Sequence, residues 1–227
     1  MNRILLIMLI GMMLLAACGG GDVPAPVDVE VGSSADDIDA EAEEVELPEV
    51  EAGDCDAGIG PGVNLSWCEF RDMNLSGSNL SGANVTNARF FGSNVSESDF
   101  SGAIMAEVLI SESNFSGSDF SGADMRKGVL SGNNFSGSDF REANLSKALL
   151  RGSNLIGVDL RGADLSEALL SGANLTDADF SGADFSGADL SFSVLSGSNI
   201  SAEQIAQAAS TEGAVMPGSD SDEEIDY

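Results

Sequence analysis

Between Leu65 and Ile200 every fifth residue is Leu, Phe, Ile, Val or Met, without exception. These 28 positions stay in one register. An α-helix places side chains on one face with a period of 3.6 residues, and a strand does so with a period of two. Because neither period produces a strict five, the sequence predicts an architecture in which a short unit recurs.

Each unit has a fixed order of residue types around its apolar centre. The residue two places before the centre is usually small, and the next is usually Asn or Asp. Ser usually follows the centre and is often followed by Gly, as in residues 181–185. This order resembles the pentapeptide-repeat family over about three fifths of the chain. The resemblance implies an all-β fold, a right-handed quadrilateral β-helix with four units per coil, in which the centre and the small residue face inward.

The residues just before the centres repeat with a period of 20, which supports four sides independently. They sort into an Asn column, an Asp column, an apolar column and a mixed column. The columns are Asn74, Asn94, Asn114, Asn134, Asn154 and Asn174; Asp99, Asp119, Asp139, Asp159 and Asp179; Leu109, Val129, Leu149 and Leu169; and Asn84, Ile104, Asp124, Asn144, Asp164 and Asp184. Four sides predict about seven coils over residues 55–200, and therefore a rod roughly 34 Å long.

Burial should arise only when coils stack, because a single coil leaves its centres facing water. We expect Phe100, Phe120 and Phe140, one coil apart, to stack ring on ring. Gly after Ser should supply the corner dihedrals that other residues resist. We expect local bulges where the small residue is replaced, at Val108, Asn133 and Val158.

The N-terminus has the pattern of an export signal. Arg3 precedes an apolar run over residues 4–15, which is too short to span a bilayer and is typical of a signal-peptide core. The run ends in Leu-Ala-Ala-Cys18, which is similar to the lipobox of bacterial lipoproteins. The resemblance implies a signal peptide over residues 1–17 and lipidation of Cys18, for example by palmitate. A plain secretory signal followed by a chance Cys is the alternative. Gly19, where Asp would suggest inner-membrane retention, favours the outer membrane or cell surface.

The segments that flank the repeats are acidic. Residues 18–54 contain no Lys or Arg and few large apolar residues, which predicts a disordered tether. A cation-binding arm is the alternative, although residues 41–46 fix no ligand geometry. After the repeats, Ser201 and Gln204 form a capping box that predicts a short capping helix over residues 201–209, with Ile205 folded over the last coil. An acidic, disordered tail should follow over residues 210–227.

Two cysteines remain after the proposed lipidation site. Cys68 occupies an inward small position, and Cys55 precedes a Gly-rich loop over residues 58–62. Because disulfides persist in exported proteins, we expect a bridge that fixes this loop over the open end of the core. Two free thiols packed as small apolar groups are the alternative. Trp67 should cover the same end, although its place after Ser66 would point it outward.

Composition excludes most catalytic chemistry. The chain has no His, so a Ser-His-Asp arrangement is impossible and the commonest metal ligand is missing. A net charge of -29 should repel nucleic acid and anionic membrane surfaces. The acids of the Asp column are equivalent, whereas a glycosidase needs two different ones. We therefore predict no enzyme, cofactor or metal. Arg141 and Arg161 should pair with half of the Asp column, and calcium bound along its upper part is an alternative to solvated, locally paired acids.

The apolar column is the best candidate site. By the register, Leu109, Val129, Leu149 and Leu169 face outward and form a strip about 15 Å long. Residues of both signs edge the strip, as they would a binding rim: Glu107, Lys127, Lys147 and Glu167. The alternative is a different turn on this side, in which these apolar side chains tuck against their neighbours.

These observations predict a non-enzymatic, lipid-anchored scaffold of the cell envelope. The apolar strip would bind a protein partner or a second copy, and we expect no nucleic acid or small-molecule substrate. The family resemblance implies one alternative, because some members resemble DNA in shape and charge and bind topoisomerases. Those targets are cytoplasmic, which the leader argues against. An ice-binding face would need regularly spaced rows of Thr, and the rod has only Thr86 and Thr176.

Overall fold

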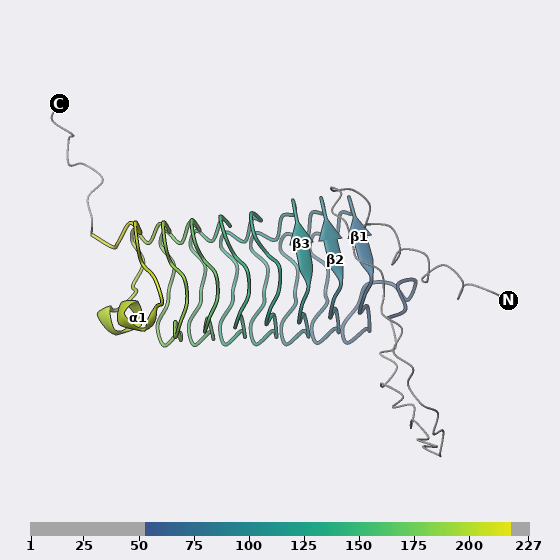
Figure 1. Ribbon diagram of the computed structural model, residues 1–227. Helices are drawn as coiled ribbons and strands as arrows, with labels where there is room; N and C mark the ends of the chain where they lie inside the picture. Colours follow the sequence, from purple (N-terminus) through teal and green to yellow (C-terminus); the bar gives the residue numbers. More distant parts are fainter. Residues whose placement is uncertain (1–52, 219–227) are drawn as a thin grey trace, which may run out of the picture. The chain divides into compact units, whose positions relative to one another are not determined.

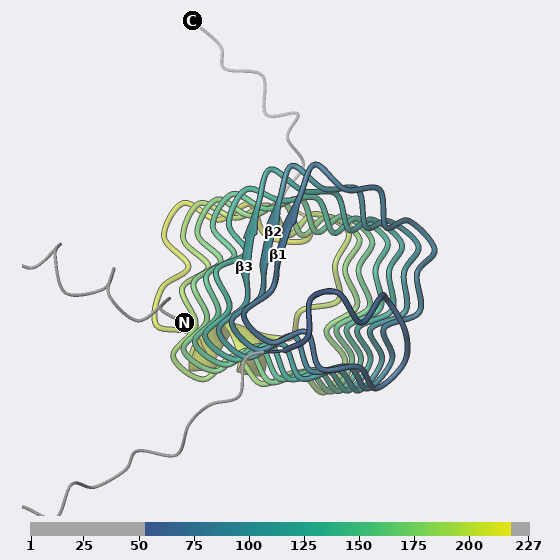
Figure 2. The same cartoon turned by 90° about the vertical axis from the view of Figure 1, so that its right-hand side faces the viewer.

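The computed structural model describes residues 53–218. These residues form a four-sided solenoid, seen from the side in Figure 1 and along its axis in Figure 2. Among them, no helix is long and apolar enough to cross a membrane. The predicted signal peptide, Cys18, the tether up to residue 52 and the end of the acidic tail lie outside the described residues.

Residues 20 apart pair in parallel along the rod. Strands β1 (Glu69–Arg71), β2 (Arg89–Phe91) and β3 (Leu109–Ser111) form a sheet in the order β1-β2-β3. Single parallel bridges continue this side and build the other three, and they link the members of each predicted column. The period of 20 is therefore confirmed as one coil of backbone pairing.

The 28 repeat centres form the core. Every centre from Leu65 to Ile200 is buried. The ring centroids of Phe100 and Phe120 lie 5.3 Å apart and those of Phe120 and Phe140 lie 4.8 Å apart, with interplanar angles of 15° and 11°. The predicted stack of rings is confirmed, and it continues the hydrogen-bonded spacing of the wall through the interior.

Each corner is a tight turn. The backbone N–H of Ala83 donates to the carbonyl of Leu80 at 3.0 Å, and Gly82 between them has φ +63°. Only glycine adopts this left-handed region at no steric cost. Lys127 and Glu142 adopt it as well, with φ +57° at both. The turn is therefore imposed by the stacking of coils and does not depend on glycine at every corner.

The expected bulges are absent. Val108 and Val158 are buried, and the ladder continues past them with N···O distances of 2.8–3.1 Å. Asn133 stands in a column of inward serines and replaces their hydrogen bonds, because its amide nitrogen donates to the carbonyls of Ile110 and Leu130 at 2.8 and 2.9 Å. The wall therefore accepts side chains larger than Ala or Ser at these inward positions without a break in its ladder.

The C-terminal end differs from the prediction. Helix α1 (Ala202–Gln207) begins with the expected capping box, in which the Ser201 side chain accepts from the Gln204 N–H. The residue buried over the last coil is Gln204, whose Nε2 donates to the carbonyls of Phe180 and Ala183 at 2.7 and 2.9 Å. Ile205 is only partly buried. A polar side chain suits this place because a coil end leaves backbone carbonyls without partners.

Residues 210–218 are not a detached tail. Ser210 bridges Asp189 and Val215 bridges Val194, so the chain returns to the solenoid after α1. The step between partners is here 21 residues, because the six-residue helix replaces a side of five. Thr211 and Met216 thereby take the places of centres, one residue out of the earlier register. The prediction of a tail from residue 210 was wrong for this segment.

Candidate functional site

The side that contains β1, β2 and β3 carries the apolar column. We call this side and its two corners the β1 wall. It comprises four outward columns in steps of 20 residues, which start at Trp67, Glu69, Arg71 and Asp72. The strip residues belong to the second column and are linked by successive parallel pairing. Val129 is 37% exposed, and the other three are half-buried. The structure therefore brings the four predicted residues together on the outer surface.

The rim of the strip is internally paired. Lys127 Nζ lies 3.4 Å from Glu107 Oε1, and Lys147 Nζ lies 3.6 Å from Glu167 Oε1. All four residues have φ between +56° and +61°, the same corner conformation as the glycines of the other sides. The alternative of a different turn on this side is therefore wrong. The centre of the β1 wall is an apolar strip beside two exposed ion pairs.

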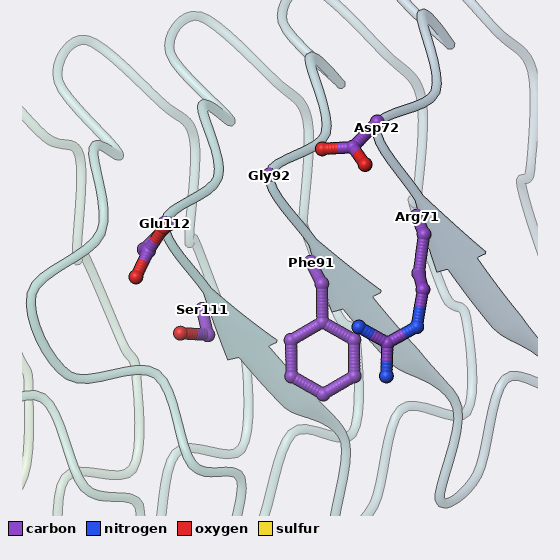
Figure 3. A pocket seen from close by; sticks show the side chains of 6 residues that line it. All are labelled: Arg71, Asp72, Phe91, Gly92, Ser111 and Glu112. Atoms are coloured by element: carbon purple, nitrogen blue, oxygen red, sulfur yellow. The ribbon is translucent and has the colours of Figure 1, made fainter.

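A shallow hollow lies on the same wall, at the ends of β1, β2 and β3 (Figure 3). The guanidinium carbon of Arg71 lies 4.4 Å from the centroid of the Phe91 ring, and Arg71 also pairs with Glu69. Gly92 opens the hollow, since a Cβ there would lie 2.6 Å from the carboxylate of Asp72. Ser111 and Glu112 belong to the coil of β3, whereas Asp72 projects from the coil of β1 (Figure 3). The hollow therefore joins an aromatic ring, a guanidinium and two carboxylates on one surface.

Aromatic residues outside the core gather on the β1 wall. Among residues 53–218, the aromatic side chains that are not buried are Trp67, Phe91 and Phe192. Trp67 is 50% exposed and Phe192 is 64% exposed, and both have left-handed backbone with φ +66° and +58°. Trp67 therefore projects outward and does not cover the end of the core. Sequence reasoning missed that these residues share one wall, two near its first levels and Phe192 at its last, although all three lie on columns of one side.

Arg side chains of the same chain pair with carboxylates of the Asp column. Arg141 forms two hydrogen bonds to Asp139 through Nε, at 2.8 and 2.9 Å, and its Nε lies 3.7 Å from Asp159. Arg161 repeats this contact with Asp159 and lies 3.7 Å from Asp179. Within residues 53–218, no group of three or more acidic, His or Cys side chains is placed to hold a metal ion. Arg141 and Arg161 thus pair with Asp139, Asp159 and Asp179, and these contacts do not reach Asp99 and Asp119.

Several carboxyl groups of the rod are held ionised. Burial acts to raise the pKa of Asp139, but hydrogen bonds from the side chain and backbone of Arg141 outweigh it and leave this pKa below its ordinary value of 3.8. The hydroxyl and N–H of Ser181 lower the pKa of Asp179. The pKa values of two further groups are lowered by hydrogen bonds from the Ser two residues on, at Asp184 and Asp189.

These lowered pKa values predict a loss of stability in acid. A folded-state pKa below the unfolded value means that the unfolded chain binds more protons, so the contribution is complete above the ordinary pKa of 3.8 and is lost as the pH falls through the folded value. Replacing Asp179 and Asp184 by Asn, which occupies equivalent positions at Asn199 and Asn144, should reduce the acid sensitivity. Thermal melting between about pH 6 and pH 2 measures this difference. Parallel curves for both proteins would contradict the assignment.

Cys55 and Cys68 lie at the N-terminal end of the rod and are joined by a disulfide, with 5.5 Å between their Cα atoms. The adjacent Gly53 N–H donates to the Ser66 carbonyl at 2.8 Å. A Cβ on Gly53 would lie 2.5 Å from the Ser66 nitrogen, so only glycine fits this approach. The backbone at Gly53 thus lies close against Ser66, just before the β1 wall.

Comparison with known proteins decides the family. A family model described as "Pentapeptide repeats (8 copies)" matches residues 62–96, 93–132, 134–172 and 163–201, which is more than half of the chain. The chain belongs to the pentapeptide-repeat family. Membership implies that the four-sided β-helix is right-handed, as the sequence resemblance suggested. Pentapeptide-repeat proteins are generally non-enzymatic scaffolds. No curated protein matches the chain.

Solved pentapeptide-repeat structures resemble this chain at low identity. QnrB1, a plasmid-mediated fluoroquinolone resistance protein, is 20% identical, with 70% of this chain and 91% of that chain covered and a TM-score of 0.28. HetL from the cyanobacterium Nostoc sp. strain PCC 7120 is 26% identical, with 69% and 86% covered and a TM-score of 0.22. A thylakoid-lumen protein of Arabidopsis thaliana is 24% identical, with 59% and 72% covered and a TM-score of 0.16.

Proposed function

We propose that this pentapeptide-repeat protein is a lipid-anchored scaffold of the cell envelope that binds a protein partner through the β1 wall and performs no catalysis. Lipidation at Cys18 would hold the chain at the outer membrane or cell surface, and the acidic segment up to residue 54 would separate the solenoid of about seven coils from the bilayer. The disulfide between Cys55 and Cys68 suits an oxidising compartment outside the cytoplasm.

The observation that carries this proposal is the exposed apolar strip. Outward positions of the other sides hold mostly Asn, Asp, Ser and Gly, whereas Leu109, Val129, Leu149 and Leu169 form a continuous ladder. An apolar centre with charged residues at its margin is the usual composition of a protein-binding patch. Val129 is exposed and the other three are half-buried, so the strip presents a partly exposed apolar surface.

Metabolic labelling tests the anchor. Radioactive palmitate should label the wild-type protein and should not label a Cys18→Ser variant, because this substitution removes the thiol that the acyl chain requires. Labelled protein should fractionate with the envelope. Unlabelled wild-type protein in the soluble cytoplasm would contradict the lipoprotein proposal. Proximity cross-linking on intact cells would then show whether Leu149→Asp removes a protein contact.

Mimicry of DNA is the second candidate, because the Asp column places one carboxylate per coil along the rod. The same column argues against it, since Arg141 and Arg161 neutralise Asp139, Asp159 and Asp179 in part. Inhibition of a purified topoisomerase would support the DNA mimic. Lipid anchoring outside the cytoplasm, if the labelling experiment finds it, would exclude this role at a cytoplasmic target.

A further inference from the structure

Charge is distributed unevenly among the walls of the rod. The β1 wall holds five basic and six acidic residues: Arg71, Arg89, Lys127, Lys147 and Arg151, with Glu69, Asp72, Glu107, Glu112, Glu167 and Asp189. Elsewhere within residues 53–218 only Arg126, Arg141 and Arg161 are basic, against fifteen acids. Two copies of a chain of net charge -29 repel each other through most of their surface. The β1 wall is the surface on which this repulsion is nearly absent.

We propose that the β1 wall binds a second copy of this chain, antiparallel, with the two-fold axis at Val129. This inference rests on the proposed role of the wall as a protein-binding surface and names its occupant. A two-fold interface brings the same patch of both copies together. Val129 lies on the middle of the seven levels from Glu69 to Asp189, so an axis there gives complete overlap of the two walls. Leu109 then lies opposite the partner's Leu149, and Val129 opposite the partner's Val129.

Charge decides the orientation. In the antiparallel arrangement each column faces itself in reverse order, which sets Glu107 opposite the partner's Lys147. It also brings Glu112 to the level of the partner's Arg151, and Arg89 to the level of the partner's Glu167. Like charges meet only where Lys127 faces itself and where Glu69 faces the partner's Asp189. Lys127 retains its own partner, Glu107, at 3.4 Å.

A parallel arrangement of fully overlapping walls is unfavourable. The two corner columns would exchange, so Glu107 would face the partner's Glu112. The strip column would face the column that starts at Arg71, and Leu149 would lie against the partner's Arg151. The apolar strip would then be covered by Ser and Arg in place of a second strip.

The ends of the wall fit the same register. Trp67, half-exposed in one corner column, lies at the level of the partner's Gly187, the one glycine of that column between residues 67 and 187. Phe192 lies at the level of the partner's Arg71 and Asp72. A guanidinium near an aromatic ring is a favourable contact, and Arg71 already makes one with Phe91. The exposed aromatic side chains thus meet small or cationic groups.

The size of the wall predicts a weak dimer. Seven levels at about 4.8 Å and a width of about four residues give roughly 900 Å² in the two copies together. This area lies below the 1,200–2,000 Å² that is typical of stable complexes. We therefore expect a dissociation constant in the micromolar range. Anchoring to a membrane surface would offset this weak affinity, because it concentrates the copies.

Two single variants test the charge register. Glu107→Lys and Lys147→Glu should each weaken the dimer about tenfold or more, because each sets two like charges opposite each other across the axis. A mixture of the two variants should restore binding to within about threefold of the wild type, since each Lys then meets a Glu. Native mass spectrometry of the detergent-purified full chains, with one variant labelled with 15N, measures homodimers and heterodimers separately. Thermal melting verifies that both variants remain folded.

Two single-cysteine variants test the position of the two-fold axis. Val129→Cys should form an intermolecular disulfide under mild oxidation, whereas Ile104→Cys, a matched exposed aliphatic residue on another side that is 47% exposed, should not. Equal cross-linking of Val129→Cys and Ile104→Cys would overturn the inference. So would a mixture of Glu107→Lys and Lys147→Glu that shows no preference for the mixed dimer. A chain that stays monomeric at about 200 µM, well above the expected dissociation constant, also overturns it. If Leu149→Asp then still removes a cross-link to another protein, the proposed function survives.

Discussion

Replacing Phe120 by Ala should destabilise the rod by about 3–5 kcal/mol, the range for loss of a buried aromatic side chain. Phe120 is fully buried, and four other rings lie within 6.0 Å of its centroid: Phe100, Phe115, Phe135 and Phe140. Hydrogen-bonded coils above and below hold the spacing, so the cavity cannot close by collapse. Chemical denaturation followed by circular dichroism measures the loss.

Phe192→Ala is the matched control for this experiment. The residue type and the substitution are the same, but Phe192 is 64% exposed and lies over Gly213 at the last coil. Its removal should change the free energy of unfolding by no more than about 0.5 kcal/mol. Equal losses for Phe120→Ala and Phe192→Ala would contradict the placement of the repeat centres on a common buried axis.

Loss of the bridge between Cys55 and Cys68 should cost about 3 kcal/mol. The two residues are 13 apart in sequence, and closing a loop of this size in the unfolded chain removes an entropy of that order. Cys55→Ala with Cys68→Ala is the suitable variant, because Ala occupies the equivalent inward position at Ala88, Ala148 and Ala168. Denaturant unfolding measures the loss.

Reduction supplies the control for the cysteine variant. Wild-type protein in excess dithiothreitol should unfold at the same denaturant concentration as the double variant, since both lack the cross-link. The variant itself should not respond to the reductant. A wild-type protein that also shows no response would mean that the thiols are free, the alternative that the sequence left open.

The period of five was sufficient to predict the architecture, because every coil of the solenoid obeys the same rule. Burial of 28 centres, the ladders of Asn and Asp, and the stacking of Phe100, Phe120 and Phe140 all follow from one register. The apolar strip followed from the period of 20. A repeat fold translates sequence spacing directly into position, which is why these features needed no knowledge of long-range contacts.

The errors arose where this translation fails. The return of residues 210–218 was missed because α1 shifts the register by one residue, and the pattern in Gly213, Ala214 and Met216 no longer falls on multiples of five. The bulges expected at Val108 and Asn133 depended on volume alone, whereas the ladder continues past both and Asn133 donates hydrogen bonds to buried carbonyls. The outward direction of Trp67 follows from its place after Ser66, which the expectation that it covers the end of the core set aside.

The replacement of one five-residue side by six-residue α1 limits how such a chain can change in length. An extra residue in any middle coil would turn every later centre toward water, because all later levels are stacked on it. After α1 only the short segments around Ser210 and Val215 follow, and they still bridge the previous coil with a step of 21 residues. Duplication or loss of whole 20-residue coils should therefore be the permitted route to longer or shorter rods, and single-residue insertions should accumulate beside the terminal helix.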